Sequence, residues 1–529
     1  MKINFKRIRS FWLVPAISIL AGSSRAEVDI HIGQNFQGAA LGADSFLVPP
    51  DADGAVGPNH YVQLVNGRFT VYSKTNGSVV VTLADTDFWT NAGIDMTGLI
   101  ASDPRVYYDP SSQRWFASQI DVDNNTLNGN RFLIGISSNS DPSGAWKAVA
   151  FAGDTNGNFA DFPMLGLDGN GVYVSANMFG PGFSGTFLGV QTVSIPKADL
   201  LLSTPTASNR TYSGLLSSDA WGFAPQPVVN YASTNGAETV LAVASDGTDR
   251  HAHTLLRAYA ISNSVSSNAI FTNLTSIVVP AYNVPINPPQ PDGLDTLDDG
   301  DSRISASVYQ VGNTIFAVHG SEVGPHAVVR WYKIDAASLT LLQSGTISDS
   351  NLDLFYPSIA ANSNGVVVIG FNGCSTNSFI SSYAAVGETS GGNTVFGDKI
   401  LLQPGAGNYE VSVGGDNRWG DYSAISVDPA NPNHFWTIQE IPSAANIWST
   451  QITELVVTPR PALAMAISNG FYTATWPTNA NGFALQSKTN LLQTNWFAVT
   501  NAAVTAGTNF AVTARATNTQ FFRLVNPAP

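Results

Sequence analysis

The chain of 529 residues carries 24 basic and 38 acidic side chains, a net charge of −14 at pH 7, and a single cysteine, Cys374. The acidic surplus disfavours a nucleic-acid partner, because such a surface repels phosphate backbones. One cysteine excludes an internal disulfide framework, so stability has to come from buried apolar area.

Residues 1–26 have the layout of a secretory signal peptide. A basic start is followed by an apolar run from Phe11 to Gly22, and Ser24 and Ala26 occupy the small-residue positions of a cleavage site. The run has 12 residues, whereas a membrane span needs roughly 20. We therefore expect a secreted protein, extracellular or periplasmic, without a transmembrane segment, in which residues 27–44 form an N-terminal extension.

Residues 45–458 contain a repeated hairpin pattern and no helical periodicity. Each copy opens with a polar or proline-containing segment, continues as a short apolar strand, turns, and returns as a second apolar strand. Tyr356–Ala360, for example, is followed by the turn Asn364-Gly365 and by Val366–Ile369. The seven copies begin at residues 53, 103, 161, 226, 301, 356 and 418. Each interval leaves room for two more strands, which predicts a seven-bladed β-propeller, with a large β-sandwich or a β-helix as the alternative.

The composition of the chain changes at the stretch Thr458-Pro459-Arg460-Pro461. Glu454 is the last acidic residue of the sequence. A proline-rich segment at a change in charge predicts a domain boundary. We expect residues 459–529 to form a small β-sandwich, so that the whole chain is all-β.

The openings of the repeats hold the candidate site residues, because the first strand of each blade lines the central channel. The candidate ligand-binding residues are Asp103, Arg105, Asp161, Asp301, Arg303, Tyr356, Arg418 and Asp421. In one interpretation the three arginines clamp a carboxylate ligand by bidentate hydrogen bonds. In the other, each arginine pairs with an aspartate at a repeat opening, such as Asp103, Asp301 or Asp421, and ties the blades together.

Two acidic segments are candidates for calcium, and the sequence indicates no other cofactor. The first has five aspartates between Asp292 and Asp301, and the second, Asp121-x-Asp123-x-Asn125, resembles the start of a calcium loop. The second segment lacks the glycine and the closing glutamate of an EF-hand, and solvated turns are the alternative for both. No phosphate-binding loop, nucleophile elbow or zinc-protease motif occurs, so we assign no catalytic residue.

Three stretches of the sequence resemble uncharacterised secreted bacterial β-propellers of the sialidase-like, BNR-repeat group. They are Asp51–Asn66, Asp103–Val106 and Arg418–Tyr422. The resemblance covers roughly residues 45–457, and residues 461–529 resemble fibronectin-type-III-like modules. Sialidases bind the substrate carboxylate with an arginine triad. Sialidase chemistry also requires a tyrosine nucleophile assisted by a glutamate, and Tyr422 and Glu440 are present without a spacing that pairs them.

The chain departs from the sialidase pattern in three ways. It has seven repeats where sialidases have six, its nearest match to their Asp-box, Asp141–Trp146, has altered spacing, and Asn139 replaces the leading serine of that box. The expected function is therefore a secreted, non-enzymatic and monomeric recognition protein that binds an extracellular glycan or a protein surface. The alternative is a sialidase-like, glycan-active hydrolase that uses the arginine-bearing end of the channel. An open pocket in which Arg105, Arg303 and Arg418 converge beside an unpaired carboxylate would favour the hydrolase.

Overall fold

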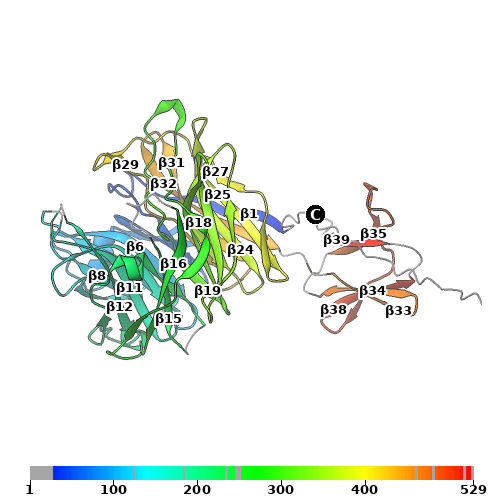
Figure 1. The fold of residues 1–529 in the computed structure, drawn as a ribbon, viewed down its shortest axis with the longest axis horizontal. Coiled ribbons are helices and arrows are strands. Elements are labelled where there is room, and N and C mark those ends of the chain that lie inside the picture. The colour runs from blue at the N-terminus through cyan, green and yellow to red at the C-terminus, as the bar shows by residue number, and fades with distance from the viewer. Residues whose placement is uncertain are drawn as a thin grey trace, which may run out of the picture.

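The computed structural model describes residues 28–458 without 124, 183–184, 233–235 and 245–251, and residues 461–525 without 462, 479–482 and 516–519. The expected signal peptide, residues 1–26, lies outside the described residues. Strands dominate the fold (Figure 1), and the helices are short: α1 (Asp85–Asn91), α2 (Lys197–Leu200), α3 (Ser218–Trp221) and the 3₁₀ helix η1 (Pro291–Gly293). Among the described residues, no helix has the length and apolar character needed to cross a membrane.

The strands of residues 29–458 fall into groups of consecutive antiparallel hairpins. The first three groups are β2 (Asp53–Val56), β3 (His60–Val65), β4 (Arg68–Ser73) and β5 (Val79–Leu83); β6 (Ile100–Asp109), β7 (Arg114–Val122), β8 (Arg131–Ser137) and β9 (Trp146–Ala152); and β10 (Phe159–Leu167), β11 (Gly171–Phe179), β12 (Phe187–Pro196) and β13 (Thr211–Tyr212). The next two are β14 (Phe223–Val229), β15 (Glu238–Val243), β16 (His253–Ser262), β17 (Ile270–Asn273) and β18 (Ile277–Tyr282); and β19 (Val308–Val311), β20 (Thr314–Val323), β21 (His326–Asp335) and β22 (Leu341–Ile347). The last two are β23 (Asp353–Ala361), β24 (Val366–Ser375), β25 (Ser378–Ser390), β26 (Asn393–Phe396) and β27 (Ile400–Gln403); and β30 (Ala424–Val427), β31 (His434–Ala444), β32 (Ile447–Thr458) and β1 (Asp29–Ala40). A small ribbon of β28 (Ser412–Val413) and β29 (Asp416–Asn417) precedes the last group.

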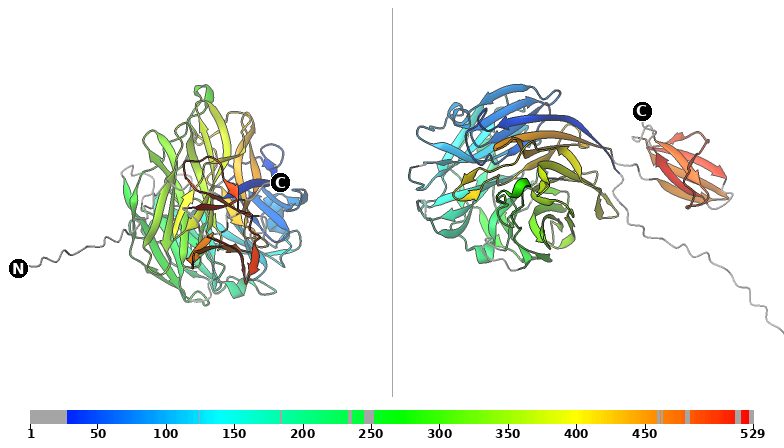
Figure 2. Two further views of the ribbon diagram at one scale, coloured as in Figure 1. Left: turned by 90° about the vertical axis from the view of Figure 1, so that its right-hand side faces the viewer. Right: turned by 90° about the horizontal axis from the view of Figure 1, so that it is seen from above.

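The first strands of these groups, here called the inner strands, contact one another in an unbroken cycle. The strand β2 contacts β6, and the contacts continue through β10, β14, β19, β23 and β30 back to β2. Where inner strands pair directly, β10 with β14 and β14 with β19, they run parallel. The right-hand view of Figure 2 follows this order, since blue, cyan, green and yellow segments succeed one another around the body. All inner strands in this cycle can therefore present their beginnings at one end of a common axis.

Residues 27–44 were expected as an N-terminal extension, and within this range Asp29–Ala40 adds a strand to the last group. Strand β1 pairs antiparallel with β32, from Asp29 opposite Thr458 to Ala40 opposite Ser449, and Figure 2 shows the blue strand beside the orange one. The physical reason is that β32 would otherwise present an unpaired edge. The N-terminal strand therefore completes the sheet that the end of the same region begins.

Two predicted first strands are placed differently by the structure. Residues 301–306 and 418–423 contain no strand, and the inner strands that follow them begin only at Val308 and Ala424. An extended segment that leads into a strand has the same apolar pattern as the strand itself, so the sequence does not separate the two. Arg303 and Arg418 thus lie on irregular segments, whereas Arg105 lies inside β6.

The hydrophobic core lies between neighbouring groups of strands. One cluster joins Val62 and Phe69 of the β2–β5 sheet to Trp115 and Leu133 of the β6–β9 sheet. The inner strands approach closely at Gly166, where a Cβ atom would lie 2.6 Å from the carbonyl oxygen of Pro227. Only glycine allows β10 and β14 to come this close.

Residues 461–525 have a core of their own. One sheet has the order β33 (Ala464–Ser468), β34 (Phe471–Pro477), β38 (Asn509–Arg515) and β37 (Val504–Ala506), and the other has the order β36 (Phe497–Ala498), β35 (Ala484–Lys488) and β39 (Phe521–Val525). Trp476 and Val512 of the first sheet and Leu485 and Leu524 of the second belong to one buried cluster. The change in composition seen in the sequence therefore falls between separate hydrophobic cores.

Candidate functional site: a carboxylate pocket where the inner strands begin

A pocket of about 610 Å³ lies where the inner strands begin. Its side chains come from the segments that precede β2, β19 and β30 and from the first residues of β6 and β10, so they converge from five groups of strands. The lining residues are Leu47, Val48, Pro49, Asp51, Asn66, Ile100, Ser102, Asp103, Asp161, Asp298, Gly300, Asp301, Arg303, Arg418 and Asp421. The pocket therefore combines six carboxyl groups with two guanidinium groups, and we call it the carboxylate pocket.

A recurring distortion of the inner strands shapes this end of the axis. In four of these strands a residue with positive φ directly precedes a proline: Asp103 (56°), Phe162 (53°), Ala224 (48°) and Tyr356 (43°). The pairing of each strand with its neighbour shifts at the same place. A bulge of this kind bends the strand and redirects a side chain, so the bulge turns Asp103 out of the regular strand direction.

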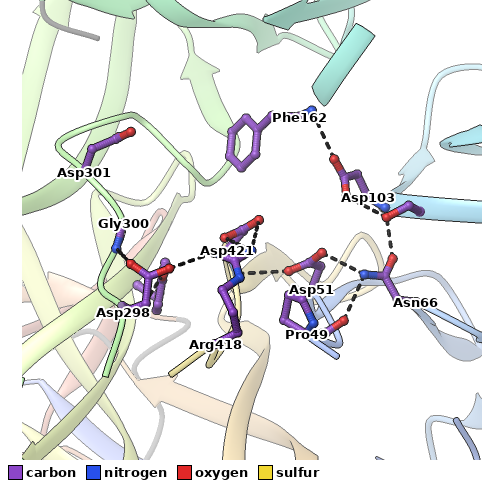
Figure 3. A network of polar contacts seen from close by, with 12 residues as sticks. Pro49, Asp51, Asn66, Asp103, Phe162, Asp298, Gly300, Asp301, Arg418 and Asp421 are labelled. Atoms are coloured by element: carbon purple, nitrogen blue, oxygen red, sulfur yellow. Dashed lines mark hydrogen bonds and ion pairs between the residues drawn. The ribbon is translucent and has the colours of Figure 1, made fainter. Parts of the chain in front are cut away.

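Side chains from neighbouring groups of strands accept hydrogen bonds from the backbone N–H of residues at the bulges (Figure 3). The N–H of Asp103 donates to Oδ1 of Asn66 at 2.9 Å, and the N–H of Phe162 donates to Oδ2 of Asp103 at 3.0 Å. The amide of Asn66 donates to Oδ2 of Asp51 at 2.7 Å, and Oδ1 of Asp51 accepts the N–H of Asp421 at 3.0 Å. These hydrogen bonds fix three of the pocket side chains, Asp51, Asn66 and Asp103, relative to one another and to the backbone of Asp421.

Each arginine of the carboxylate pocket is held by aspartates. Nη2 of Arg303 lies 2.6 Å from Oδ2 of Asp301, and Nε donates to both oxygens of the same carboxylate at 2.9 and 3.0 Å. Nη1 of Arg418 donates to Oδ2 of Asp298 at 2.8 Å, and its Nη2 lies 2.9 Å from Oδ1 of Asp421. These pairs are partly exposed, so both cations are neutralised while they remain accessible from the pocket.

The remaining carboxyl groups of the pocket bind protons more tightly than usual. Burial raises the pKa of Asp161 to about 7, and the nearby carboxyl of Asp103 adds to this effect while Arg303 opposes it. The pKa of Asp51 is also raised, mainly by burial and then by the neighbouring Asp421, and burial raises that of Asp103. No ion pair among the described residues involves Asp161. The pocket thus places carboxyl groups with raised pKa values next to carboxylates that are paired with arginine.

Arg105 lies deeper along the axis and does not line the carboxylate pocket. Its guanidinium is fully buried, with Nη1 3.4 Å from Oδ2 of Asp53 and Nη2 donating to the carbonyl of Ser305 at 3.0 Å. The ring of Tyr422 covers it at 3.4 Å from its centroid. Side chains from several groups of strands thereby fill the axis below the pocket. Arg105 lies apart from Arg303 and Arg418 because it belongs to a strand and they belong to the segments before strands.

The structure brings most of the predicted site residues together. Six of the eight line the carboxylate pocket: Asp103, Asp161, Asp301, Arg303, Arg418 and Asp421. Tyr356 is buried beside it, and its hydroxyl donates to the carbonyl of Asp298 at 3.0 Å, so its visible role is to position the segment that carries Asp298. Arg105 instead packs below the pocket, where it contacts Asp53 and the ring of Tyr422.

Nine of the fifteen lining residues were not among the predicted binding residues, and three of these nine, Asp51, Asn66 and Asp298, make the hydrogen bonds and ion pairs described above. Asp298 belongs to the acidic segment that was a candidate for calcium, and Asp51 lies two residues before the start of the first repeat. Asn66 was not singled out as a binding residue, because it follows the second strand of its group and not a repeat opening.

The calcium candidates have other partners. Asp298 and Asp301 hold arginines, Asp121 pairs with Arg131, and Asp123 accepts the N–H of Asn125 at 2.9 Å. Among the described residues, no group of three or more histidine, cysteine, aspartate or glutamate side chains has an arrangement that could hold a metal ion.

The pair required for sialidase chemistry is not available in the carboxylate pocket. The hydroxyl of Tyr422 donates to the carbonyl of Pro104 at 2.9 Å, its ring is buried against Arg105, and Glu440 is buried as well. Neither side chain lines the pocket. A tyrosine nucleophile in this position could not reach a substrate.

Comparisons with known proteins assign no family. No protein-family model and no curated protein sequence matches the chain. Among solved structures, extracellular domains 1–2 of Drosophila Semaphorin 1b match at 7% identity over 82% of this chain and 88% of that chain, with a TM-score of 0.39. The α-L-arabinofuranosidase Arb93A from Fusarium graminearum, in complex with an iminosugar inhibitor, matches at 9% identity over 80% and 97%, with a TM-score of 0.39. Trypanosoma rangeli sialidase, with the inhibitor DANA, matches at 9% identity over 74% and 73%, with a TM-score of 0.33. Likenesses of this size assign no activity to the chain.

Proposed function

We propose that residues 29–458 form a closed seven-bladed β-propeller and that the carboxylate pocket is the active site of a secreted, glycan-active hydrolase. The cycle of contacts between inner strands supports the closed ring, and strand β1 completes its last blade. Residues 459–529 are proposed to be an appended fibronectin-type-III-like module with its own core. The signal-like layout of residues 1–26 supports export.

The observation that carries the hydrolase is the presence of two kinds of carboxyl group in one open pocket. Glycoside hydrolysis uses a protonated carboxylic acid, which donates a proton to the leaving oxygen, and a carboxylate, which attacks the sugar or activates water. A pair of titratable groups whose surroundings separate their pKa values identifies the acid and the base. Asp161, with its pKa near 7, is the proposed acid.

Asp421 is the proposed carboxylate partner of Asp161. It contacts Arg418, and its charge contributes to the raised pKa of Asp161, which places the two groups close together. Asp301 is less suited to this role, because Arg303 donates to it through its backbone N–H, Nε and Nη2, whereas a single nitrogen of Arg418, Nη2, contacts Asp421. The proposed reaction therefore needs no tyrosine nucleophile and differs in this respect from sialidase chemistry.

The remaining groups of the pocket fit a neutral substrate rich in hydroxyl groups. Both arginines are already neutralised by aspartates, so a carboxylate ligand would have to displace an existing partner. The carboxyl groups of the pocket offer acceptors and donors for sugar hydroxyls. The arginine clamp for an acidic ligand is accordingly the less favoured use of this site.

Hydrolysis of a panel of 4-nitrophenyl glycosides and unlabelled polysaccharides tests the proposal, with released nitrophenol and reducing ends as the two readouts. We expect the full chain to release product from at least one substrate. Asp161→Asn should lower kcat/KM by about 10²–10⁴-fold, and Asp87→Asn, which changes an exposed carboxyl on α1, should leave it unchanged. If the folded protein retains a glycan without cleaving any member of the panel, the hydrolase is rejected in favour of a recognition protein.

A further inference from the structure

A second pocket, of about 300 Å³, lies at the opposite ends of the inner strands. Val56, Val311, Ala361 and Val427 are the last residues of β2, β19, β23 and β30, and all four line it. Three tyrosines (Tyr108, Tyr231 and Tyr309), three prolines and one charged residue, Asp428, also line it. We call it the tyrosine pocket.

The tyrosine pocket does not communicate with the carboxylate pocket through the axis. Arg105, Asp53 and Tyr422 fill the axis below the carboxylate pocket. Further along, the hydroxyl of Tyr107 lies 2.6 Å from Oγ of Ser307 and donates to the carbonyl of Leu165 at 3.1 Å. A ligand in the tyrosine pocket therefore cannot be part of the substrate bound at the other end.

The tyrosine pocket has apolar and aromatic walls around a buried floor. Ala55, Val56, Tyr108 and Tyr309 are buried, whereas the prolines of the rim are exposed. Pockets of this size with mostly apolar walls and a few polar groups are the usual form of small-molecule sites. Tyrosine rings and proline rings also offer flat faces against which another ring can stack.

The tyrosine pocket presents no uncompensated charge among the described residues. Asp428 is its only charged lining residue, and the ammonium of Lys74 lies 2.9 Å from Oδ2 of that carboxylate while the N–H of Ala430 donates to Oδ1 at 2.8 Å. Burial raises the pKa of Tyr108, Tyr231 and Tyr309 above the ordinary value, so their phenols stay neutral. A charged ligand would lose its hydration without gaining an ion pair.

The polar side chains of the wall are largely occupied by the protein. The amide of Asn362 donates to the carbonyl of Pro432 at 2.6 Å, that of Gln310 donates to the carbonyl of Gly312 at 2.9 Å, and Oγ of Ser426 accepts the N–H of Val56 at 3.0 Å. A sugar would need many such groups to be free, because its hydroxyls lose water on binding. The wall is therefore suited to a ligand with few polar atoms.

We propose that the tyrosine pocket is a second ligand site and that it takes a neutral aromatic small molecule, one or two rings in size. The proposal goes beyond the hydrolase and does not depend on it. Neutrality follows from the paired state of Asp428, and aromatic character follows from the three tyrosines and three prolines of the wall.

Binding of indole to the full-length protein tests the proposal, with isothermal titration calorimetry as the readout. Glucose serves as the neutral, non-aromatic comparison and benzoate as the charged aromatic one. We expect saturable binding of indole and binding of glucose and benzoate that is weaker by about tenfold or more. An absence of saturable indole binding, or equal binding of all three probes, would overturn the proposal.

A pair of matched variants places the bound indole. Val311→Trp enlarges a half-buried residue of the pocket wall, and Val323→Trp makes the same change at an exposed residue of β20 that lines neither pocket. We expect Val311→Trp to weaken indole binding by about tenfold or more, and Val323→Trp to bind as the parent does. Ala361→Leu, a smaller change on the pocket floor, gives a second test if Val311→Trp fails to fold. Indole affinity that is unchanged in a folded pocket variant would place the ligand elsewhere and contradict the assignment.

Discussion

Replacing Arg105 with alanine removes one partner of a fully buried ion pair. In the protein its guanidinium is 0% exposed and lies 3.4 Å from the carboxylate of Asp53, under the ring of Tyr422. Loss of one member of a buried pair costs about 3–5 kcal/mol, because the other charge is left without compensation. We expect Arg105→Ala to lower the free energy of unfolding by about this amount at pH 8.

The loss caused by Arg105→Ala should depend on pH. Burial raises the pKa of Asp53 to about 7 even though Arg105 lowers it, so removal of Arg105 raises this pKa further. Over a range above pH 7, native Arg105→Ala therefore keeps the proton on Asp53, whereas the native parent and the unfolded chain have both released it. A native state that binds more protons than the unfolded state loses stability as pH rises. The difference between parent and variant should therefore be smaller at pH 5, where Asp53 is protonated in both native proteins.

Urea unfolding at pH 5 and pH 8 measures both effects. The double variant Arg105→Ala/Asp53→Asn is the control, since an amide at position 53 keeps an acceptor for the N–H of Val106, which now donates to Asp53 Oδ1 at 3.0 Å. We expect the double variant to recover part of the loss at pH 8 and to show little dependence on pH. A single variant within about 1 kcal/mol of the parent, or a loss that neither pH nor Asp53→Asn alters, would refute the reasoning.

Three further predictions concern the carboxylate pocket and the domain boundary. Arg418→Met should cost about 1 kcal/mol in urea unfolding, because its pairs with Asp298 and Asp421 are partly exposed; a loss as large as that of Arg105→Ala would show that these pairs are buried. The raised pKa of Asp161 makes the parent lose stability as pH rises from 5 to 7, because the native state then binds more protons than the unfolded chain. Asp161→Asn should therefore gain stability relative to the parent over this range, by at most about 1.4 kcal/mol per pH unit. The same comparison with Asp87→Asn should show no such gain, and a flat difference for Asp161→Asn would contradict the raised pKa. A chain truncated after Thr458 should melt cooperatively by calorimetry, because the two hydrophobic cores are separate; an insoluble product would place the boundary elsewhere.

The strand pattern was predictable because it depends on local signals. The hairpin Tyr356–Ala360 to Val366–Ile369 lies within β23 and β24, where apolar residues are bounded by an Asn-Gly turn. The strand β1 escaped prediction as part of the last sheet, because its partner β32 lies at the far end of the region and no local pattern specifies such a pairing.

The geometry of the site was less predictable than its residues. The sequence indicates that Asp103 and Tyr356 open their repeats, but a residue before proline normally avoids the α regions of the backbone. Their positive φ values follow from tertiary contacts, such as the hydrogen bond from the N–H of Asp103 to Asn66. Arg105 and Arg303 both follow an aspartate by two residues, so the sequence around them does not distinguish their positions. They lie at different depths because Arg105 belongs to a strand and Arg303 belongs to the segment before one.

The pH dependence of kcat/KM for a glycoside substrate tests the central claim most directly, because it asks whether Asp161 acts as the proton donor. Asp161 must be protonated to donate, so we predict that kcat/KM falls as pH rises through about 7, the raised pKa of this carboxyl group. Asp161→Asn should lose about 10²–10⁴-fold in kcat/KM with a substrate whose leaving group needs a proton. A parent rate that stays constant from pH 6 to pH 9, or an Asp161→Asn variant that keeps the parent's rate and profile, would contradict the assignment of this pocket as a hydrolase site with Asp161 as its acid.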